Sequence, residues 1–351
     1  MNSKKNIALI SGGQGYEHDV SEMSAENLFS LIDKGLYSVF LVHINKDGNW
    51  YISQNECKKY IKFSSANDFF CEGFPVRCGG TSGVLSNGNL IPIDCAIPCL
   101  HGNFGEDGSV QGTLSTAGIA YIGQDVYASA MTSDKIYTKL AAERLNIPTA
   151  RWIFSDGSDC ADAKRRANEN LAYPLFIKPA RLGSSYGAHP IFSESEFESA
   201  FEDSRKYDSR ILIEELVEFD HELECALFDN GKRVIFPGGK VLSGGTFYDF
   251  DSKYTAEMSP KTEAKTDAFT DAEKKAAEYS NALAALIGIR HLSRFDFFVT
   301  KDDKIIFNEI NAFPGMTETS LYPKLVSKIG NKNGDFINLL IDKVCSYDRR
   351  I

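Results

Sequence analysis

Two adjacent apolar segments near the C-terminal end, residues 294–299 and 304–311, carry the side chains best suited to chemistry. A short Lys-Asp-Asp turn joins them, which predicts a β-hairpin. Because side chains alternate between the two faces of a strand, each strand presents three of these side chains together. The predicted faces carry Arg294, Asp296 and Phe298 on the first strand, and Phe307, Glu309 and Asn311 on the second.

Asp296, Glu309 and Asn311 could therefore meet across this hairpin. Two carboxylates about 4 Å apart repel each other by roughly 4 kcal/mol at an effective dielectric constant of about 20. A hard divalent cation removes that penalty, and three oxygen ligands of this kind suit Mg²⁺ with a phosphate group as co-ligand. An ordinary solvated strand face is the alternative, but charges inside such apolar strands usually need partners.

Residues 178–187 follow a predicted strand and read KPARLGSSYG. Glycines let backbone N–H groups approach phosphate oxygens, and Lys178 adds a point charge. The segment also matches GxSxG with Ser185 at its centre, as in the nucleophile elbow of serine hydrolases. That elbow needs a helix directly after the serine, whereas the next helix cap is Ser193. A glycine-rich hairpin is favoured over the elbow, and a plain structural turn stays open.

Three further loops carry candidate residues. Glu17 follows the predicted strand 6–10, where open parallel sheets bind ligands, so it could hold an ammonium group or simply favour a helix dipole. His101 ends the predicted strand 94–100, and taken alone it is best interpreted as an ordinary buried histidine. Residues 244–254 form a polar, aromatic loop from which Lys253 could reach a phosphate, unless the loop is merely exposed.

Strands alternate with helices along the chain, which predicts an α/β fold with an N-terminal open, mostly parallel sheet. Two helix starts are marked by capping boxes, Ser193 with Glu196 and Thr270 with Glu273, and Gly288 ends the second of these helices. The expected helices cover 21–32, 134–145, about 193–201 and 270–287, and the further strands cover 37–44, 175–178, 211–215 and 222–228.

Composition excludes several classes of protein. The 351 residues carry 38 Lys and Arg against 48 Asp and Glu, a formal charge of −10, which argues against a nucleic-acid or anionic-membrane binder. No run of about 18 apolar residues and no secretory signal is present, so neither a membrane span nor export is expected. Eight scattered cysteines without a CxxC pair indicate reduced thiols in a cytoplasmic protein.

Taken together and in this order, these segments resemble the D-alanine–D-alanine ligase family of the ATP-grasp fold. The resemblance covers about residues 5 to 343, and one segment alone would be weak. The segments that carry it are EHDVS at 17–21, HG at 101–102 with GEDG at 105–108, DK at 134–135, KP at 178–179 with GSS at 183–185, the 248–254 loop, RFD at 294–296, and NEIN at 308–311 with PGM at 314–316.

The resemblance implies three domains: residues 1–123 for substrate binding, a central ATP-grasp subdomain over 124–217 and a C-terminal subdomain over 218–351 with the metal site and the loop. ATP would lie between the last two. It implies phosphate contacts from Lys135, Lys178 and Lys253, adenine contacts from the backbone of Glu214, Glu215, Leu216 and Val217, and a ribose contact from Glu222. Glu214 and Glu215 both stay open as the residue at the adenine hinge, because the segment is one residue longer than expected.

For the reacting groups, the resemblance implies two Mg²⁺ ions, with Mn²⁺ as a substitute, on Asp296, Glu309 and Asn311. Glu17 would bind the ammonium group of the first D-alanine and be linked to Ser184 and Tyr254, while Arg294 would stabilise the tetrahedral oxyanion. His101, Ser320 and Leu321 are the remaining expected substrate-binding residues.

The implied reaction joins two D-alanine molecules through an acyl phosphate for peptidoglycan precursor synthesis, with ATP as co-substrate. Tyr254 and Leu321 favour D-alanine as the second substrate, and D-serine is the alternative. Family members are commonly dimers, so a homodimer is expected. A serine hydrolase using Ser185 and a non-catalytic nucleotide-binding protein are the competing hypotheses.

Overall fold

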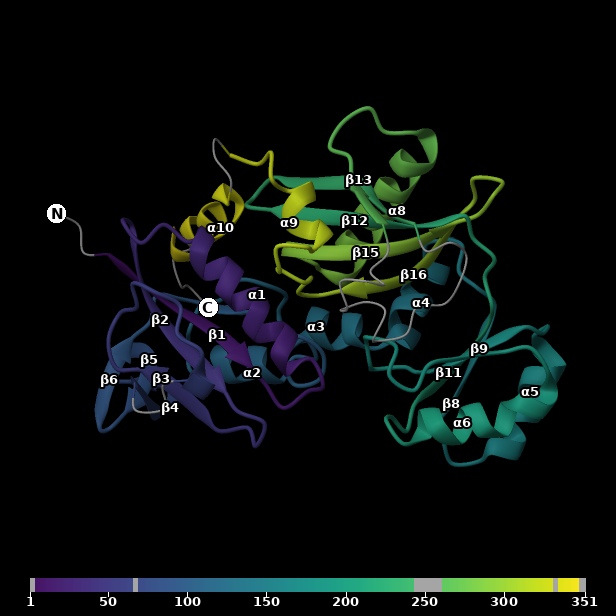
Figure 1. The fold of residues 1–351 in the computed structure, drawn as a ribbon, viewed down its shortest axis with the longest axis horizontal. Helices are drawn as coiled ribbons and strands as arrows, with labels where there is room; N and C mark the ends of the chain where they lie inside the picture. Colours follow the sequence, from purple (N-terminus) through teal and green to yellow (C-terminus); the bar gives the residue numbers. More distant parts are fainter. Residues whose placement is uncertain (1–3, 66–68, 243–260, 331–333, 347–351) are drawn as a thin grey trace.

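The computed structural model describes residues 4–65, 69–242, 261–330 and 334–346, arranged around three β-sheets (Figure 1). Lys253 and Tyr254 lie outside these described residues, so their predicted roles stay predictions. The predicted domain borders at residues 123 and 217 both fall between sheets, the second between strands β11 (Ile211–Glu215) and β12 (His221–Asp229).

The first sheet has a parallel part, as expected from the strand–helix alternation. Strand β1 (Lys5–Gly12) lies between β2 (Tyr37–Ile44) and β7 (Cys95–Pro98) and is parallel to both. Helix α1 (His18–Leu31) connects β1 to β2, and it begins three residues earlier than predicted. Helix α2 (Ser109–Thr116) follows β7. The carboxyl ends of these strands therefore present Glu17 and His101 at one edge of the sheet.

The sheet as a whole is mixed rather than mostly parallel, because four further strands add antiparallel pairs. Short turns over residues 45–49, 79–80 and 87–88 join three of these four pairs, and a short turn can only make an antiparallel pair. At Asn87-Gly88, both residues have positive φ, which suits a two-residue hairpin turn. The added strands are β3 (Trp50–Ser53), β4 (Phe70–Cys78), β5 (Thr81–Ser86) and β6 (Asn89–Pro92).

The central part holds a four-stranded antiparallel sheet with the order β10-β9-β11-β8. Helices α5 (Cys160–Asn170) and α6 (Phe197–Arg205) bury Ala163, Phe197 and Phe201 against Ile177 and Ile213 of this sheet. Its other elements are the strands β8 (Trp152–Ser155), β9 (Leu175–Pro179) and β10 (His189–Ile191), and the preceding helices α3 (Val126–Ser133) and α4 (Lys135–Arg144).

One predicted helix start in this part is wrong. Helix α6 begins at Phe197, after a short 3₁₀ turn over Glu194–Glu196, instead of at Ser193. Glu196 accepts hydrogen bonds from the Phe192 backbone N–H and the Ser193 hydroxyl, so its carboxylate closes a turn ahead of the helix.

The third sheet is antiparallel throughout, with the order β14-β13-β12-β15-β16. Helix α8 (Asp271–Ile287) covers one face, and its start and end are as predicted: Thr270 and Glu273 form the capping box and Gly288 ends it in the left-handed conformation. The remaining elements are β13 (Arg233–Leu242), β14 (Lys261–Ala264), β15 (His291–Val299), β16 (Ile305–Asn311), α9 (Leu321–Leu325) and α10 (Asp335–Ser346).

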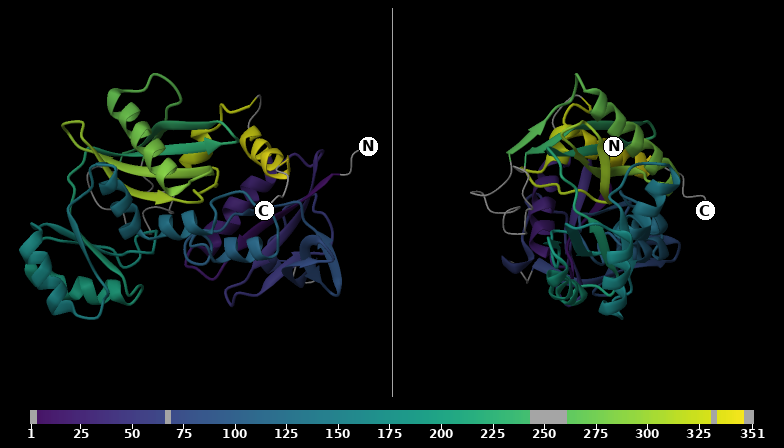
Figure 2. Two further views of the ribbon diagram at one scale, coloured as in Figure 1. Left: turned by 180° about the vertical axis from the view of Figure 1, so that it is seen from behind. Right: turned by 90° about the vertical axis from the view of Figure 1, so that its right-hand side faces the viewer.

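The last helix ties the two ends of the chain together. α10 lies against α1 of the N-terminal part, as Figure 1 and the left-hand view of Figure 2 show. Its Phe336, Ile337 and Leu340 share a buried cluster with Leu28 and Phe29 of α1. The N-terminal substrate loops and the C-terminal sheet are thus held in a fixed relation by apolar packing.

Candidate active site

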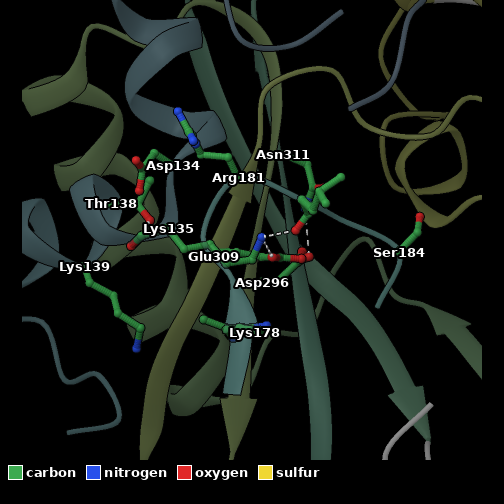
Figure 3. Close-up of polar contacts among 12 residues, drawn as sticks. Asp134, Lys135, Thr138, Lys139, Lys178, Arg181, Ser184, Asp296, Glu309 and Asn311 are labelled. Atoms are coloured by element: carbon green, nitrogen blue, oxygen red, sulfur yellow. Dashed lines mark hydrogen bonds and ion pairs between the residues drawn. The ribbon is translucent and has the colours of Figure 1, made fainter. Parts of the chain in front are cut away.

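The hairpin of β15 and β16 brings the predicted metal ligands together. Asp296 pairs directly with Glu309, and Arg294 pairs with Asn311. Asn311 donates its amide N–H to Asp296 Oδ2 at 2.9 Å, which leaves its amide oxygen as a potential ligand. Figure 3 shows these three side chains converging, with Lys135 reaching towards them from α4 and its Nζ 3.3 Å from Glu309 Oε2.

The predicted position of Phe307 on this face is wrong. The strand register shifts between Asp296 and Phe297, so that Asn308 is the extra residue of a β-bulge. Phe307 therefore faces the core, where its ring packs at 5.7 Å from that of Phe297. The bulge turns Asn308 towards Lys178, whose Nζ is 3.4 Å from Asn308 Oδ1.

Arg294 makes a paired contact with the central carboxylate. Its Nε and Nη2 each donate to an oxygen of Asp296 at 2.7 Å, and Glu224 Oε2 of the neighbouring strand lies 3.5 Å from Nε. Burial alone would lower the pKa of Arg294, but Asp296 and Glu224 raise it well above its usual value. The guanidinium therefore stays charged, which its predicted role in stabilising an oxyanion requires.

Of the three predicted phosphate lysines, two lie within the described residues, and they come from different elements. Lys135 begins α4, just after its N-cap Asp134, and Lys178 lies in β9. Lys135 Nζ also donates to the Leu182 carbonyl at 2.6 Å, at the base of the glycine-rich segment. Both lysines are at most 9% exposed. A phosphate that contacts them would be shielded from bulk water, and the attraction between opposite charges is stronger away from bulk water.

Glu214 has a side-chain role that the sequence did not predict. Its carboxylate contacts Lys178 Nζ at 2.5 Å and Lys139 Nζ at 2.6 Å. Burial raises the pKa of Glu214, but the two lysines outweigh that effect and lower it to about 2. Lys139 is 1% exposed and lies one helical turn after Lys135, a spacing that could have pointed to it.

The hinge between β11 and β12 follows Glu214. Glu215 pairs with Arg151 at 3.3 Å, and its backbone N–H, like that of Leu216, is already bonded within the chain. Glu222 lies opposite Phe298 on the face that carries Asp296. The adenine contacts of Glu215, Leu216 and Val217, and the ribose contact of Glu222, stay predictions.

At the amino-acid end of the site, two loops from distant parts of the chain meet. Ser184 Oγ donates to Glu17 Oε1 at 2.5 Å, and the rings of Tyr16 and Tyr186 lie 4.7 Å apart. Ser184 and Ser185 both have positive φ, and strand β10 rather than a helix follows them. The hydrolase elbow around Ser185 is therefore absent, and the favoured hairpin between β9 and β10 is present.

His101 belongs to a hydrogen-bonded layer beneath these loops. Its Nε2 lies 3.0 Å from Ser24 Oγ, which accepts from the Met316 backbone N–H at 3.2 Å. Burial lowers the pKa of His101, although Glu17 opposes that shift, so the ring is held in its neutral form. Ser24 was missed by sequence reasoning because its partners are 77 and 292 residues away in the chain.

Glu106 is a second residue with no predicted role of its own. Its two oxygens accept backbone N–H bonds from Gly102 at 2.9 Å and Phe313 at 2.8 Å. Burial raises the pKa of Glu106 to about 7 despite these bonds. The carboxyl group joins the 101–108 loop to the segment after β16.

Ser320 and Leu321 lie at the start of α9, where Ser320 accepts from the Thr317 backbone N–H at 3.1 Å and Leu321 is buried. Their predicted contact with the second substrate is a proposal. A cavity of about 1040 Å³ among the described residues lies elsewhere. Leu223 and Val299 line it from the α8 face of the third sheet, opposite to Asp296, so it is not the predicted nucleotide site.

Solved structures with the same arrangement define the class of fold. The structure of the D-alanine-D-alanine ligase from Coxiella burnetii matches with a TM-score of 0.85 and 27% identity, over 97% of this chain and 94% of that one. A D-Ala:D-Ser ligase from Enterococcus faecalis matches with a TM-score of 0.86 and 29% identity, over 97% and 100%. The fold is therefore the predicted ATP-grasp fold.

Sequence comparisons then define the family. Residues 6–124 match the family model for the D-ala D-ala ligase N-terminus, and residues 142–342 match that for its C-terminus. The D-alanine–D-alanine ligase of Oceanobacillus iheyensis is 32% identical over 99% of this chain and 97% of its own length, and that of Borreliella afzelii is 35% identical over 97% and 95%. The chain belongs to the D-alanine–D-alanine ligase family and is a ligase enzyme.

None of the helices in the described ranges combines the length and apolar character that a membrane-spanning segment needs. All eight cysteines lie within those ranges, and none of the eight forms a disulfide there.

Proposed function

We propose that this protein uses ATP to join two D-alanine molecules into a dipeptide for peptidoglycan precursor synthesis. The observation that supports this most is the convergence of Asp296, Glu309 and Asn311 beside Lys135. These three supply only oxygen ligands, and a lysine ammonium already faces one of the carboxylates, so the donor set suits divalent cations with phosphate. Two Mg²⁺ ions, or Mn²⁺ in their place, would neutralise phosphate charge there.

The reaction needs two steps. A carboxylate oxygen of the first D-alanine attacks the γ-phosphorus of ATP, and ADP leaves as an acyl phosphate forms. The amine of the second D-alanine then attacks the acyl carbon, and inorganic phosphate leaves after the tetrahedral intermediate collapses. A carboxylate is a poor acyl donor until its oxygen becomes such a leaving group, which explains why an ATP site must adjoin an amino-acid site.

In this mechanism the chain positions charge rather than supplying a nucleophile. Glu17 would hold the first ammonium group, while Lys135 and Lys178 hold phosphate oxygens. Arg294, charged through Asp296 and Glu224, would stabilise the oxyanion, a contribution that can reach about 3–4 kcal/mol in other enzymes. The predicted exclusion of water by the 244–254 loop, with Lys253 and Tyr254, falls outside the described residues and stays a prediction.

The second substrate distinguishes two candidates. D-alanine is the main proposal, and D-serine is kept because the Enterococcus faecalis D-Ala:D-Ser ligase has the same fold with a TM-score of 0.86. We propose that the enzyme works in the cytoplasm, where ATP is available, and as a homodimer.

A coupled ADP-release assay tests the proposal. ADP and phosphate should appear only with D-alanine and Mg²⁺ together, and more slowly when D-serine or D-lactate is offered as the second substrate. Release with another amino or carboxylic acid, but none with D-alanine, would remove the substrate assignment while leaving the ATP-grasp fold intact. Binding of nucleotide without turnover under all conditions would favour the non-catalytic alternative.

A further inference from the structure

A second group of metal-ligating side chains lies outside the ATP site, in the N-terminal part. His18, Glu22 and His43 each offer one ligand atom, and these three atoms all lie within 4.8 Å of one another. His18 and Glu22 are four residues apart at the start of α1, so they lie on one side of the helix, and His43 is near the end of β2. The proposed function uses none of these three side chains.

The hydrogen bonding of His18 prepares it for a metal. Its Nδ1 lies 2.7 Å from the carbonyl oxygen of Gly13. A carbonyl can only accept, so Nδ1 carries the proton and Nε2 keeps an available lone pair. Metal-binding histidines usually donate their other ring N–H to a carbonyl or carboxylate in this way, which fixes the tautomer and the ring orientation.

His43 offers a buried nitrogen that has no hydrogen-bond partner among the described residues. The residue is 4% exposed, and its Nδ1 neither donates a hydrogen bond to these residues nor accepts one from them. Phe63 stacks on the ring at 4.3 Å, which holds the imidazole in place. Burial lowers the pKa of His43 to about 4, so the ring is neutral near pH 7, as a metal ligand must be.

Glu22 completes the set with a carboxylate that faces this nitrogen. Its Oε1 is 3.5 Å from His43 Nδ1. With bonds of about 2.0–2.2 Å, two ligands of a tetrahedral Zn²⁺ ion are about 3.4 Å apart, so these atoms need almost no rearrangement. Burial raises the pKa of Glu22, and a bound cation would offset that cost.

A glycine makes room for the two imidazoles. Gly12 has φ of +89°, and a Cβ there would lie 2.8 Å from His43 Cε1 and 3.1 Å from His18 Cε1. The positive end of the helix dipole at the start of α1 disfavours a cation by about 0.3–1 kcal/mol. The attraction between the cation and the Glu22 carboxylate at bonding distance is larger than this cost.

We propose that His18 Nε2, Glu22 and His43 Nδ1 bind a divalent transition-metal ion, with Zn²⁺ as the representative ion and water in the fourth position. The ion joins the first turn of α1 to the end of β2. Since His18 directly follows Glu17, the ion stabilises the segment that carries the amino-acid site. Imidazole nitrogens favour Zn²⁺ over Mg²⁺, so this site and the oxygen site at Asp296 select different metals.

The test is a titration of the full-length, metal-free chain with Zn²⁺ in the presence of excess Mg²⁺, followed by calorimetry and by the visible spectrum of a Co²⁺ substitute. One Zn²⁺ per chain is expected, with a tetrahedral Co²⁺ spectrum and a raised melting temperature. Glu22→Gln and His43→Gln should each weaken binding at least about tenfold. Glu26→Gln, one turn further along the exposed side of α1, is the matched control and should bind like the wild type.

Equal Zn²⁺ affinity in the wild type and in Glu22→Gln would overturn the proposal. Absence of Zn²⁺ binding by the wild type, or displacement of all bound Zn²⁺ by Mg²⁺, would also overturn it. Because Glu22 is partly exposed and the change to glutamine keeps its shape, this variant tests the site even if His43→Gln fails to fold. These readouts do not depend on ligase activity, so failure of the metal proposal would not contradict the proposed function.

Discussion

The nucleotide end and the amino-acid end of the site are built in different ways. At the nucleotide end, Asp296, Glu309 and Asn311 lie on paired strands, and their positions follow from one strand register. At the proposed amino-acid end, Glu17 and His101 lie on loops, and their side chains contact Ser184 and Ser24. Under the proposed function, phosphate chemistry would thus depend on a rigid sheet, whereas substrate choice would depend on loops that can change without altering the sheet.

Two carboxylates show the same contrast in their charge. Glu214, between Lys139 and Lys178, has a pKa lowered to about 2 and stays ionised at neutral pH. Glu106 accepts hydrogen bonds from two backbone N–H groups, and burial raises its pKa to about 7. Ion pairs therefore fix the nucleotide end, while the amino-acid end contains a group that titrates near physiological pH.

The largest expected effect is at the metal cluster. Asp296→Asn removes a carboxylate ligand and the partner of Arg294, which should cost several kcal/mol of transition-state stabilisation, or about 10³-fold in the rate of ADP release. Asp302→Asn changes an exposed acid on the turn of the same hairpin and should leave the rate unchanged. A rate within tenfold of wild type in Asp296→Asn would contradict the assigned role.

Glu214→Gln tests the buried ion pairs. It leaves Lys139 without its carboxylate, and removing one partner of a buried pair costs about 3–5 kcal/mol in the free energy of unfolding. The adjacent Glu215→Gln should cost less than about 1 kcal/mol, because its partner Arg151 is exposed. Similar denaturant midpoints for the two variants would show that the nucleotide end does not depend on these pairs.

Glu17→Gln separates the two ends by function. Removing the charge from a hydrogen bond to an ammonium group costs about 1.5–3 kcal/mol, so the KM for the first D-alanine should rise about ten- to hundredfold. The KM for ATP should change much less. Asp19→Asn, two residues further on and exposed, is the control. Equal losses for both substrates would remove the proposed role of Glu17.

A smaller effect is expected from pH. Because the folded-state pKa of Glu106 lies above its ordinary value of 4.5, the folded protein binds this proton more tightly than the unfolded chain. Its contribution to stability is complete below pH 4.5 and is lost as the pH rises to about 7, at up to about 1.4 kcal/mol per pH unit.

Glu106→Gln should abolish the pH dependence of the unfolding free energy between pH 4.5 and 7. The change also removes one side-chain oxygen that accepts a backbone N–H bond. The control Glu26→Gln should keep the pH dependence. An unchanged slope in Glu106→Gln would assign the pH dependence to another group.

The sequence predicted the elements with strong local patterns. The alternating hairpin around Asp296 and the capped helix from Thr270 to Gly288 both formed as expected. The position of Phe307 was wrong because a bulge at Asn308 reverses the alternation, and no local signal marks that bulge. The antiparallel strands β3 to β6 were missed although Asn87-Gly88 is a recognisable hairpin turn.

Within the site, prediction failed where contacts join distant segments. The pairing of Glu214 with Lys139 crosses from β11 to α4, and Glu106 reaches the backbone of Phe313, 207 residues away. Local sequence patterns contain no information on such contacts. Strand alternation predicted that Asp296, Glu309 and Asn311 meet, and the family resemblance supplied most of the other predicted site residues together with their motifs.

The central claim is that oxygen ligands on β15 and β16 hold the metal beside ATP, and that ATP then activates an amino-acid carboxylate there. The most direct measurement is a crystal structure with ADP, a phosphate analogue and Mn²⁺, in which anomalous scattering locates the metal. We predict Mn²⁺ within about 2.0–2.2 Å of oxygens of Asp296, Glu309 and Asn311, bridged to the terminal phosphate position. Mn²⁺ bound elsewhere, or phosphates distant from these residues, would contradict the account.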